Sequence, residues 1–311
     1  MRPDSVKPLA LPQRTQVSER MSIASFDVIV VGAGPAGLTA ATGTARAGLK
    51  TLCLDKLAPG GALINLAELH EVEHDGDGPQ IAAQLTDAAS EAGVELGFGE
   101  VVKLTGDARA WSIETAEGDR HTARAVVIAT GLNKGTLGLA EESRYEGLGL
   151  SHCASCDGPL YAGRPVVVAG TAGWAPREAA ELQVVAGDVT VVGPPAAGLP
   201  GGVSHLAGRI VGLQGDDGLE AVVVETDGMR KTVPASAVFV YVGQSPAAEF
   251  APEGLARDAG GHIVTDEQGR TAIAGVCAAG DVRSGARHRL PDAIADGERA
   301  AGAVVAALKK N

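Results

Sequence analysis

Short apolar runs recur along the chain, and glycine-rich turns separate several of them from helix-forming segments. The first run, residues 26–34, is followed by a helical pattern to about residue 48 and by a second run that ends at Asp55. A strand, a helix and a second strand in this order predict a βαβ unit with parallel strands. We expect a further strand of this unit at residues 125–130.

The same order of elements occurs again further along the chain. We expect a strand at residues 165–170, a helix at 178–185 and a strand at 189–193. A later apolar run, residues 237–243, resembles a strand that returns the chain to the first unit, and an alanine-rich helix ends the chain. These patterns predict an α/β protein with two Rossmann-like, three-layer ββα nucleotide-binding domains, the second inserted into the first.

The positions of these runs divide the chain into segments. We assign residues 26–143 and 247–311 to the first domain and residues 144–246 to the inserted domain. Residues 1–25 carry several Pro, Ser, Arg and Gln residues and lack periodicity, so we expect a mobile N-terminal tail.

Composition narrows the class of protein. The 43 glycines, with only 3% aromatic residues, suit closely packed α/β layers. A net charge of -12 without clustered Lys or Arg argues against a nucleic-acid partner. Since no apolar run approaches the roughly 18 residues of a membrane span, we expect a soluble protein without a membrane partner. Four cysteines and no recognisable signal peptide favour the cytoplasm, with Cys53 and Cys277 as small core residues.

The first glycine-rich turn has the spacing of a dinucleotide-binding site. Gly32-Ala33-Gly34-Pro35-Ala36-Gly37 follows a predicted strand and opens a predicted helix, which is the context that gives this motif its meaning. The first glycine allows the tight turn, the second lets a pyrophosphate approach, and the third allows close packing of the helix. Asp55 ends the next strand, where a carboxylate can bind ribose hydroxyls.

A dithiol motif, Cys153-Ala154-Ser155-Cys156-Asp157, lies between the two glycine-rich turns. The first thiol of such a pair can attack a partner disulfide, and the second can resolve the mixed disulfide. Asp157 adjoins the second sulfur and can shuttle a proton. A zinc site would need a second Cys/His pair at ligand spacing, and the sequence has none, so we expect no metal.

Five motifs in a fixed order carry a family resemblance. They are the first glycine turn, Gly60-Gly61, Ala129-Thr130-Gly131, the dithiol motif and Gly280-Asp281-Val282. From residue 26 onward the chain resembles low-molecular-weight thioredoxin reductase. The resemblance implies that the outer domain binds FAD and that the inserted domain is NAD(P)H-binding-like and carries the dithiol. It also implies domain rotation between half-reactions, a homodimer and a thioredoxin-like substrate.

The resemblance also implies roles for single residues. Cys156 corresponds to the sulfur that faces the flavin, Cys153 to the thiol that meets the substrate, and Asp157 to the acid–base residue. Asp281 corresponds to a residue that holds the ribityl or phosphate part of FAD, and a helix beginning near Pro291 would direct its positive end at the flavin. The expected FAD-binding residues are Gly32, Gly34, Pro35, Ala36, Gly37, Asp55, Gly60, Gly61, Ala62, Leu63, Ala129, Thr130, Gly131, Gly280, Asp281, Pro291, Asp292 and Ala293.

The second nucleotide site departs from the family pattern. Its turn reads Gly170-Thr171-Ala172-Gly173-Trp174-Ala175, where the methyl group of Ala172 would crowd a pyrophosphate. The family's His-Arg-Arg cluster for the 2′-phosphate of NADPH is replaced by Gly193-Pro194-Pro195-Ala196. Charge-assisted hydrogen bonds of this kind contribute about 1.5–3 kcal/mol each. NADPH is therefore a doubtful electron donor.

Two features outside these motifs have more than one reading each. The segment 283–293 replaces a short Arg-Gln-Ala run of the family. Its Arg287, His288 and Arg289 either line the flavin mouth or a partner surface, or they belong to a solvated loop. His152 either stabilises a Cys153 thiolate when protonated or is a surface histidine.

Several functions fit this combination of features. The leading hypothesis is a flavoprotein disulfide oxidoreductase that reduces a thioredoxin-like or small disulfide, with a ferredoxin or another flavoprotein as donor. An FAD-dependent dithiol oxidase using oxygen is an alternative, although Asp157 favours reduction. The other two alternatives are a conventional NADPH-dependent thioredoxin reductase and a non-catalytic flavin redox sensor.

Overall fold

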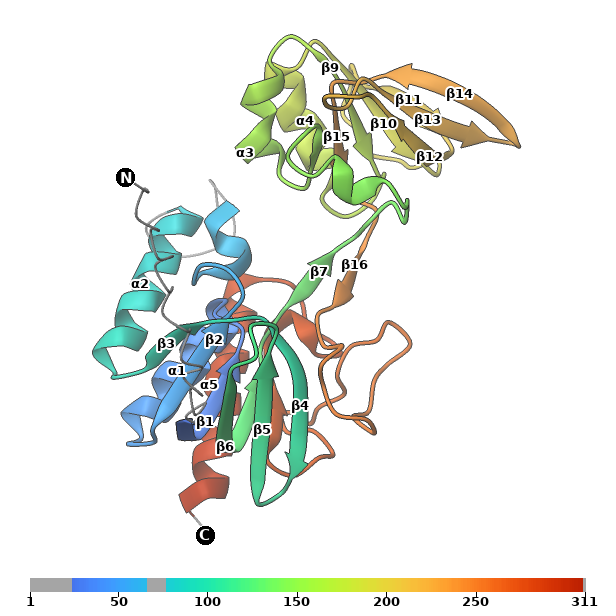
Figure 1. Cartoon of the computed structure of the whole chain (residues 1–311). Coiled ribbons are helices and arrows are strands. Elements are labelled where there is room, and N and C mark those ends of the chain that lie inside the picture. Colours follow the sequence, from blue (N-terminus) through green and yellow to red (C-terminus); the bar gives the residue numbers. More distant parts are fainter. Residues whose placement is uncertain (1–23, 66–76, 310–311) are drawn as a thin grey trace, which may run out of the picture.

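Two α/β units joined by a narrow two-stranded ribbon make up the protein (Figure 1). The computed structural model describes residues 24–65 and 77–309. Most of the expected N-terminal tail lies outside the described residues. Its last two residues, Ala24 and Ser25, are part of the first strand and pair with a neighbouring strand, so this strand begins two residues before Phe26, its expected start.

The first unit is built on a sheet with strand order β3-β2-β1-β6-β5-β4, and β17 pairs with β6 as well. Its strands are β1 (Ala24–Val31), β2 (Thr51–Asp55), β3 (Glu95–Phe98), β4 (Val101–Asp107), β5 (Ala110–Thr115), β6 (Arg120–Ile128) and β17 (Val276–Ala278). Its helices are α1 (Pro35–Arg46), α2 (Gly78–Glu91) and α5 (Leu290–Lys309), with short 3₁₀ turns η1 (Gly61–Asn65) and η4 (Gly280–Val282).

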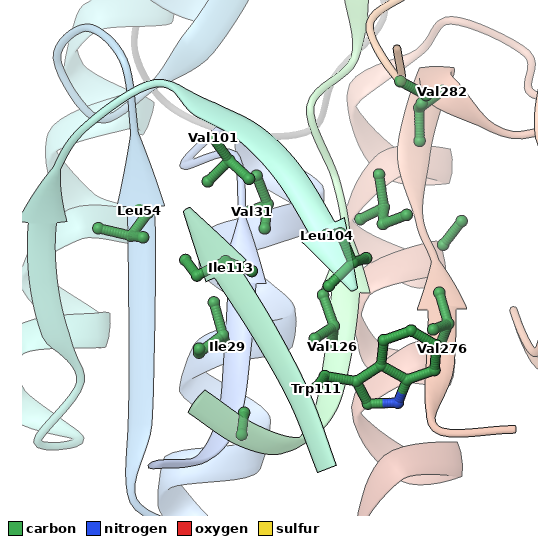
Figure 2. Packing of buried hydrophobic residues seen from close by; sticks show 14 of the residues in the cluster. Ile29, Val31, Leu54, Val101, Leu104, Trp111, Ile113, Val126, Val276 and Val282 are labelled. Carbon is green, nitrogen blue, oxygen red and sulfur yellow. The ribbon is translucent and has the colours of Figure 1, made fainter. Parts of the chain in front are cut away.

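The second half of strand β1, residues 28–31, is apolar throughout because both of its faces are covered. Val28 and Val30 face the helices α1 and α5, whereas Ile29 and Val31 face the opposite layer. Figure 2 shows that opposite layer, in which Trp111 of β5 packs beside β6 and β17. Helices on one face and the β4–β5 hairpin on the other give the three-layer arrangement that the sequence predicted.

The second unit repeats this plan on a smaller scale, with strand order β11-β10-β9-β15-β8. Its strands are β8 (Leu150–Ser151), β9 (Pro165–Ala169), β10 (Asp188–Gly193), β11 (Ser204–Ala207) and β15 (Ala237–Val240), and a separate sheet holds β12 (Arg209–Gln214), β13 (Ala221–Thr226) and β14 (Met229–Pro234). Its helical segments are α3 (Ala154–Asp157), α4 (Ala175–Val185), η2 (Glu142–Arg144) and η3 (Gly158–Tyr161).

One crossover distinguishes the two units. In the first, the chain passes from β2 to the parallel strand β3 through α2. In the second, residues 194–203 lead from β10 to the parallel strand β11 and form no helix. A parallel connection usually contains a helix. The proline- and glycine-rich sequence of this segment explains the difference, since neither residue favours a helix interior.

The ribbon between the units consists of β7 (Leu132–Lys134) and β16 (Gln244–Pro246), which pair antiparallel. Leu137 and Leu139, which the sequence division placed in the first domain, pack against the core of the second unit. Among the described residues, no helix is long and apolar enough to cross a membrane.

Candidate functional site

The first glycine turn connects β1 to α1 and is packed too closely for side chains. Gly32 has φ of 103°, and a Cβ atom there would lie 2.4 Å from the carbonyl oxygen of Ala129. A Cβ atom on Gly37 would lie 1.8 Å from the carbonyl oxygen of Gly32. At Gly34, by contrast, a Cβ atom would come within 4 Å of only one described atom, the Cα of Gly61. The turn is tight at its first and third glycines and open at its second.

The N-terminus of the helix that follows this turn can bind an anion. Pro35 is the first residue of α1, and no side chain caps the helix at Gly34. Its first amide groups are therefore available to a ligand at the positive end of the helix dipole. The 2.7 Å hydrogen bond from the amide of Gly60 to the carbonyl of Ala33 brings the Gly60-Gly61 segment against the turn.

Two further predicted segments converge on the same turn. The amide of Ala129 donates to Val31, and Thr130 and Gly131 bind the backbone of Ala247 beside the ribbon. A Cβ atom on Gly280 would lie 2.9 Å from the Cβ of Ala36. The motifs that lie far apart in the sequence therefore surround the N-terminus of α1.

Asp55 is held by backbone amides at the edge of this site. Its Oδ2 accepts from Ala33 at 2.6 Å and its Oδ1 from Leu57 at 2.9 Å. A cavity of about 530 Å³ opens beside it, and Gly32, Thr130 and Glu249 also line this space. The open second glycine, the uncapped helix and this cavity fit a dinucleotide such as FAD.

The segment from Gly280 to α5 holds a buried ion cluster that the sequence reading missed. Asp296 is only 3% exposed, and it accepts hydrogen bonds from Arg283, Arg299 and the amide of Gly280. Asp281, which the resemblance assigns to FAD, lies 3.4 Å from His288. The spacing of Asp296 and Arg299 on one helix face is the only sequence signal of the cluster.

The first turn of α5 contains Pro291, Asp292 and Ala293, because the helix begins at Leu290. Arg289 donates to Asp292 at 2.6 Å. This ion pair, with Arg287 4.0 Å from the same carboxylate, lowers the pKa of Asp292. At the other end of the site, Leu63 is buried against Leu290, and Ala62 is exposed.

The two dithiol sulfurs form a disulfide at the start of α3. Cys153 and Cys156 are bonded, with their Cα atoms 5.4 Å apart, and the amide of Cys156 lies 3.3 Å from the Cys153 sulfur. The Cys156 sulfur lies 3.6 Å from Oδ1 of Asn65, the last residue of η1. Because η1 begins at Gly61, the disulfide rests against the segment that also contacts the first glycine turn.

Asp157 has a defined partner beside the disulfide. Its Oδ2 accepts a 2.6 Å hydrogen bond from the Ser151 hydroxyl, which in turn accepts the amide of Cys153 at 3.1 Å. On the other side, the two ring nitrogens of His152 lie 3.3 Å from the carbonyl oxygen of Val240 and from the carboxylate of Glu146. Ser151 and Glu146 were not singled out by the sequence.

The second glycine turn has a different shape from the first. Pro35 of α1 is the third residue after Gly32, whereas Ala175 of α4 is the fifth residue after Gly170. Gly173 takes a φ of 61° and Trp174 precedes the helix, so the helix begins later than the motif spacing implies. It nevertheless begins earlier than the sequence reading, which placed its start at Glu178.

Residues from neighbouring elements pack against this turn and against the start of α4. A Cβ atom on Gly193 would lie 2.8 Å from the methyl group of Thr171, so the end of β10 packs directly on the turn. The Tyr241 hydroxyl donates a 2.5 Å hydrogen bond to Glu178 in the first turn of α4. A carboxylate at this position disfavours a phosphate group at the same helix end.

The other two cysteines are core residues, as the sequence indicated. Cys53 is 1% and Cys277 6% exposed. Burial is the main reason that the pKa of each thiol rises to about 12. Among the described residues, no cluster of three or more His, Cys, Asp or Glu side chains has the arrangement of a metal site.

Two dinucleotide-type units and a Cys-x-x-Cys disulfide between them define a flavoprotein disulfide oxidoreductase. The profile of the family "Pyridine nucleotide-disulphide oxidoreductase" matches residues 26–194 and 202–300. The chain belongs to this family and is a thioredoxin reductase-like, FAD-dependent disulfide oxidoreductase.

Individual relatives support this assignment. The chain is 34% identical to the thioredoxin reductase of Listeria innocua over 290 residues, which is 88% of this chain and 90% of the relative. The structure of Lactococcus lactis thioredoxin reductase in its FR conformation superposes with a TM-score of 0.82, at 30% identity, and covers 92% of this chain and 100% of that one. A ferredoxin-flavin thioredoxin reductase from Clostridium acetobutylicum has a TM-score of 0.54 at 25% identity, covering 93% and 100%.

Proposed function

We propose that the protein reduces a thioredoxin-like protein or a small disulfide through Cys153 and Cys156, with an electron donor other than NADPH. A ferredoxin or another flavoprotein is the donor class that we favour. The similarity to thioredoxin reductases supports the substrate class. The remodelled second glycine turn supports the choice of donor, and the proposal depends on this observation more than on any other.

The second nucleotide site fits NADPH poorly. Ala172 stands where a dinucleotide turn needs a glycine, and helix α4 begins two residues later than α1 does. The residues that follow β10, 194–203, carry no cation that could bind a 2′-phosphate, and the carboxylate of Glu178 lies in the first turn of α4. We therefore assign no step of the reaction to a pyridine nucleotide.

The first unit would hold FAD through the turn from Gly32 to Gly37, with Asp55 on the ribose side. When bound, FAD supplies the two electrons that reduce the disulfide. Cys156 is then the sulfur beside the first unit, because it lies against Asn65. Cys153 is left as the thiol that meets the substrate.

The dithiol half of the reaction follows from these positions. The Cys153 thiolate attacks one sulfur of the substrate disulfide, and the other substrate sulfur leaves as a thiolate. Cys156 then attacks Cys153, which restores the Cys153–Cys156 disulfide and releases the reduced substrate. Asp157, held by Ser151, takes the proton from Cys156 and gives one to the departing thiolate.

An anaerobic titration of the flavin absorbance tests the proposal. NADPH, NADH, reduced ferredoxin and a dithiol are added separately to the purified holoprotein, with Cys156→Ser as a control that removes the disulfide. We expect reduced ferredoxin first to reduce the disulfide of the wild type with two electrons and then to bleach its flavin. Rapid bleaching by micromolar NADPH would overturn the choice of donor.

NADPH-dependent reduction is the second candidate, and the similarity to proteins named thioredoxin reductase favours it. Oxygen uptake with dithiols, accompanied by peroxide, would instead indicate a dithiol oxidase. Absence of turnover with every donor would indicate a redox sensor. The proposed homodimer is tested separately by the mass of the holoprotein in solution.

A further inference from the structure

A hydrogen-bond network binds the backbone of the dithiol segment at the amide of Ala154. The amide of Ala154, the residue after Cys153, donates at 3.0 Å both to Oε2 of Glu178 and to the hydroxyl oxygen of Tyr241. The Tyr241 hydroxyl donates its own proton to the same carboxylate oxygen at 2.5 Å. The three groups come from α3, from α4 and from the residue that follows β15. Neither side chain has a role in the dithiol chemistry described above.

The Tyr241 hydroxyl is a permanent donor in this network. The tyrosine is largely buried, and burial together with the Glu178 carboxylate raises its pKa well above the ordinary value. Glu178 thus accepts two hydrogen bonds through one oxygen, Oε2. Its negative charge lies one hydrogen bond away from the peptide unit of Cys153.

Other charged groups also face the dithiol segment. His152 lies between Glu146 and the carbonyl oxygen of Val240, and Asp157 is bound by Ser151. Burial and the Asp157 charge raise the pKa of the nearby Tyr161. The Ala154 amide binds Glu178 and Tyr241 rather than any of these groups, so the Glu178–Tyr241 pair can be varied while their own partners stay in place.

One more acidic group on α4 serves for comparison. Glu181 lies one helical turn beyond Glu178 and pairs with Arg177 at 3.4 Å. It has the same side chain on the same helix, but it makes no hydrogen bond to the dithiol segment in the described structure.

We propose that Glu178 and Tyr241 are positioning residues that set how readily Cys153 ionises and how strongly the reduced dithiol donates electrons. The Glu178 carboxylate opposes a thiolate at Cys153, because like charges in proximity disfavour the ionised form. The Tyr241 hydroxyl weakens this opposition by donating to the carboxylate. The inference rests on the proposed dithiol chemistry.

The effect on reducing strength follows from the redox balance. The disulfide takes up two electrons and two protons to give two thiols, one of which ionises to the attacking thiolate. A group that destabilises this thiolate destabilises the reduced form, and the dithiol becomes the stronger reductant. Glu178 therefore favours electron transfer toward the substrate, and Tyr241 limits the effect.

The test compares Glu178→Gln, Tyr241→Phe and the control Glu181→Gln. Each holoprotein is reduced with excess dithiothreitol, and the rate of iodoacetamide alkylation at Cys153 is followed by mass spectrometry from pH 5 to about pH 10, since only the thiolate reacts. The glutamine keeps an acceptor for Ala154 but removes the charge. The phenylalanine removes the donor to Glu178 but keeps the ring.

We expect opposite shifts from the two variants. Glu178→Gln should move the alkylation midpoint about one unit toward lower pH. Tyr241→Phe should move it toward higher pH, and Glu181→Gln should leave it within a few tenths of the wild type. Above the midpoint, Glu178→Gln should also shift the equilibrium with glutathione about tenfold toward the reduced form, which is about 30 mV.

Shifts of the same sign in both variants would overturn the proposal, because they would reflect loss of structure. A midpoint shift in Glu178→Gln no larger than that in Glu181→Gln would overturn the proposal as well. An unchanged alkylation midpoint in Tyr241→Phe would show that Tyr241 has no part in the effect. If Glu178→Gln does not fold, the midpoint of Tyr241→Phe tests the proposal: a shift toward higher pH supports it, and a shift toward lower pH overturns it. Alkylation needs no turnover, so failure of the proposed electron donor would leave this measurement readable.

Discussion

The sulfur of Cys156 lies 3.6 Å from the side-chain oxygen Oδ1 of Asn65, a residue of the first unit. The Cys153 sulfur has no such contact among the described residues and instead faces Ser155 and the amide of Cys156. The two sulfurs of one disulfide are therefore not equivalent. One lies against the unit that carries the first glycine turn, and the other is the free end of the pair.

This asymmetry predicts which cysteine variant traps a substrate. Cys156→Ser leaves the Cys153 thiol able to attack a partner disulfide but removes the thiol that resolves the adduct. We expect a stable mixed disulfide with a thioredoxin-like substrate for Cys156→Ser, seen as an adduct by mass spectrometry without reductant. Cys153→Ser should give no adduct, and the reverse pattern would contradict the assigned roles.

Asp157 is expected to affect turnover without affecting flavin binding. Asp157→Asn keeps the shape of the side chain but cannot carry a proton, and general acid–base catalysis of this kind contributes about 10²–10⁴-fold in rate. We expect turnover in the presence of a competent donor to fall by about 100-fold. Ser151→Ala, which removes only the partner of the carboxylate, should cost less than Asp157→Asn.

Two glycines of the same turn should respond differently to alanine. At Gly37 a methyl group would lie 1.8 Å from the Gly32 carbonyl, so Gly37→Ala should lower both the midpoint of thermal unfolding and the flavin content. At Gly34 a methyl group meets open space where a pyrophosphate would lie, so Gly34→Ala should lower the flavin content while the apoprotein stays as stable as the wild type. Equal flavin content in Gly34→Ala and the wild type would contradict this placement.

The Asp296 cluster should contribute to stability. Asp296→Ala leaves Arg283 and Arg299 without their buried partner, and we expect the free energy of unfolding to fall by about 2–3 kcal/mol, below the 3–5 kcal/mol of fully buried pairs because Arg299 is 40% exposed. Denaturant titration measures the change. Asp292→Ala, which removes a more exposed ion pair, should cost less than Asp296→Ala.

The buried thiols predict a loss of stability at alkaline pH. Cys53 and Cys277 have a pKa of about 12 in the folded protein, whereas an unfolded thiol has about 8.5. Between these values the unfolded state binds fewer protons than the folded state, so the free energy of unfolding falls as pH rises. The stabilisation is fully present below about pH 8.5 and is lost toward pH 12. The variant Cys53→Ala/Cys277→Ala should flatten this slope in denaturant titrations.

Much of the first unit could be predicted because its signals are local. The spacing of Gly32, Gly34 and Gly37 after an apolar strand indicated the turn, and Asp55 marked the end of the next strand. The two buried faces of β1 explain why its run is continuous. Cys53 and Cys277 were also expected in the core, since both lie in apolar strands.

The contacts that the sequence did not indicate join residues far apart in the chain. Tyr241 reaches Glu178 and Ala154 across the second unit, and Asn65 reaches Cys156 between units. The periodicity of apolar residues does not indicate such pairs, because each pair depends on how complete elements are placed relative to one another. The start of α4 at Ala175 was missed for another reason: Gly173 adopts a left-handed conformation within the turn before the helix, and glycine spacing alone does not indicate it.

The ribbon of β7 and β16 has a consequence for movement. Both chain crossings between the units run side by side, and the return crossing is bound to Thr130 and Gly131 through the backbone of Ala247 (Figure 1). Because the two paired strands are joined to the first unit at one end, a twist of the ribbon would turn the second unit while the contacts of Thr130 and Gly131 with Ala247 stay in place.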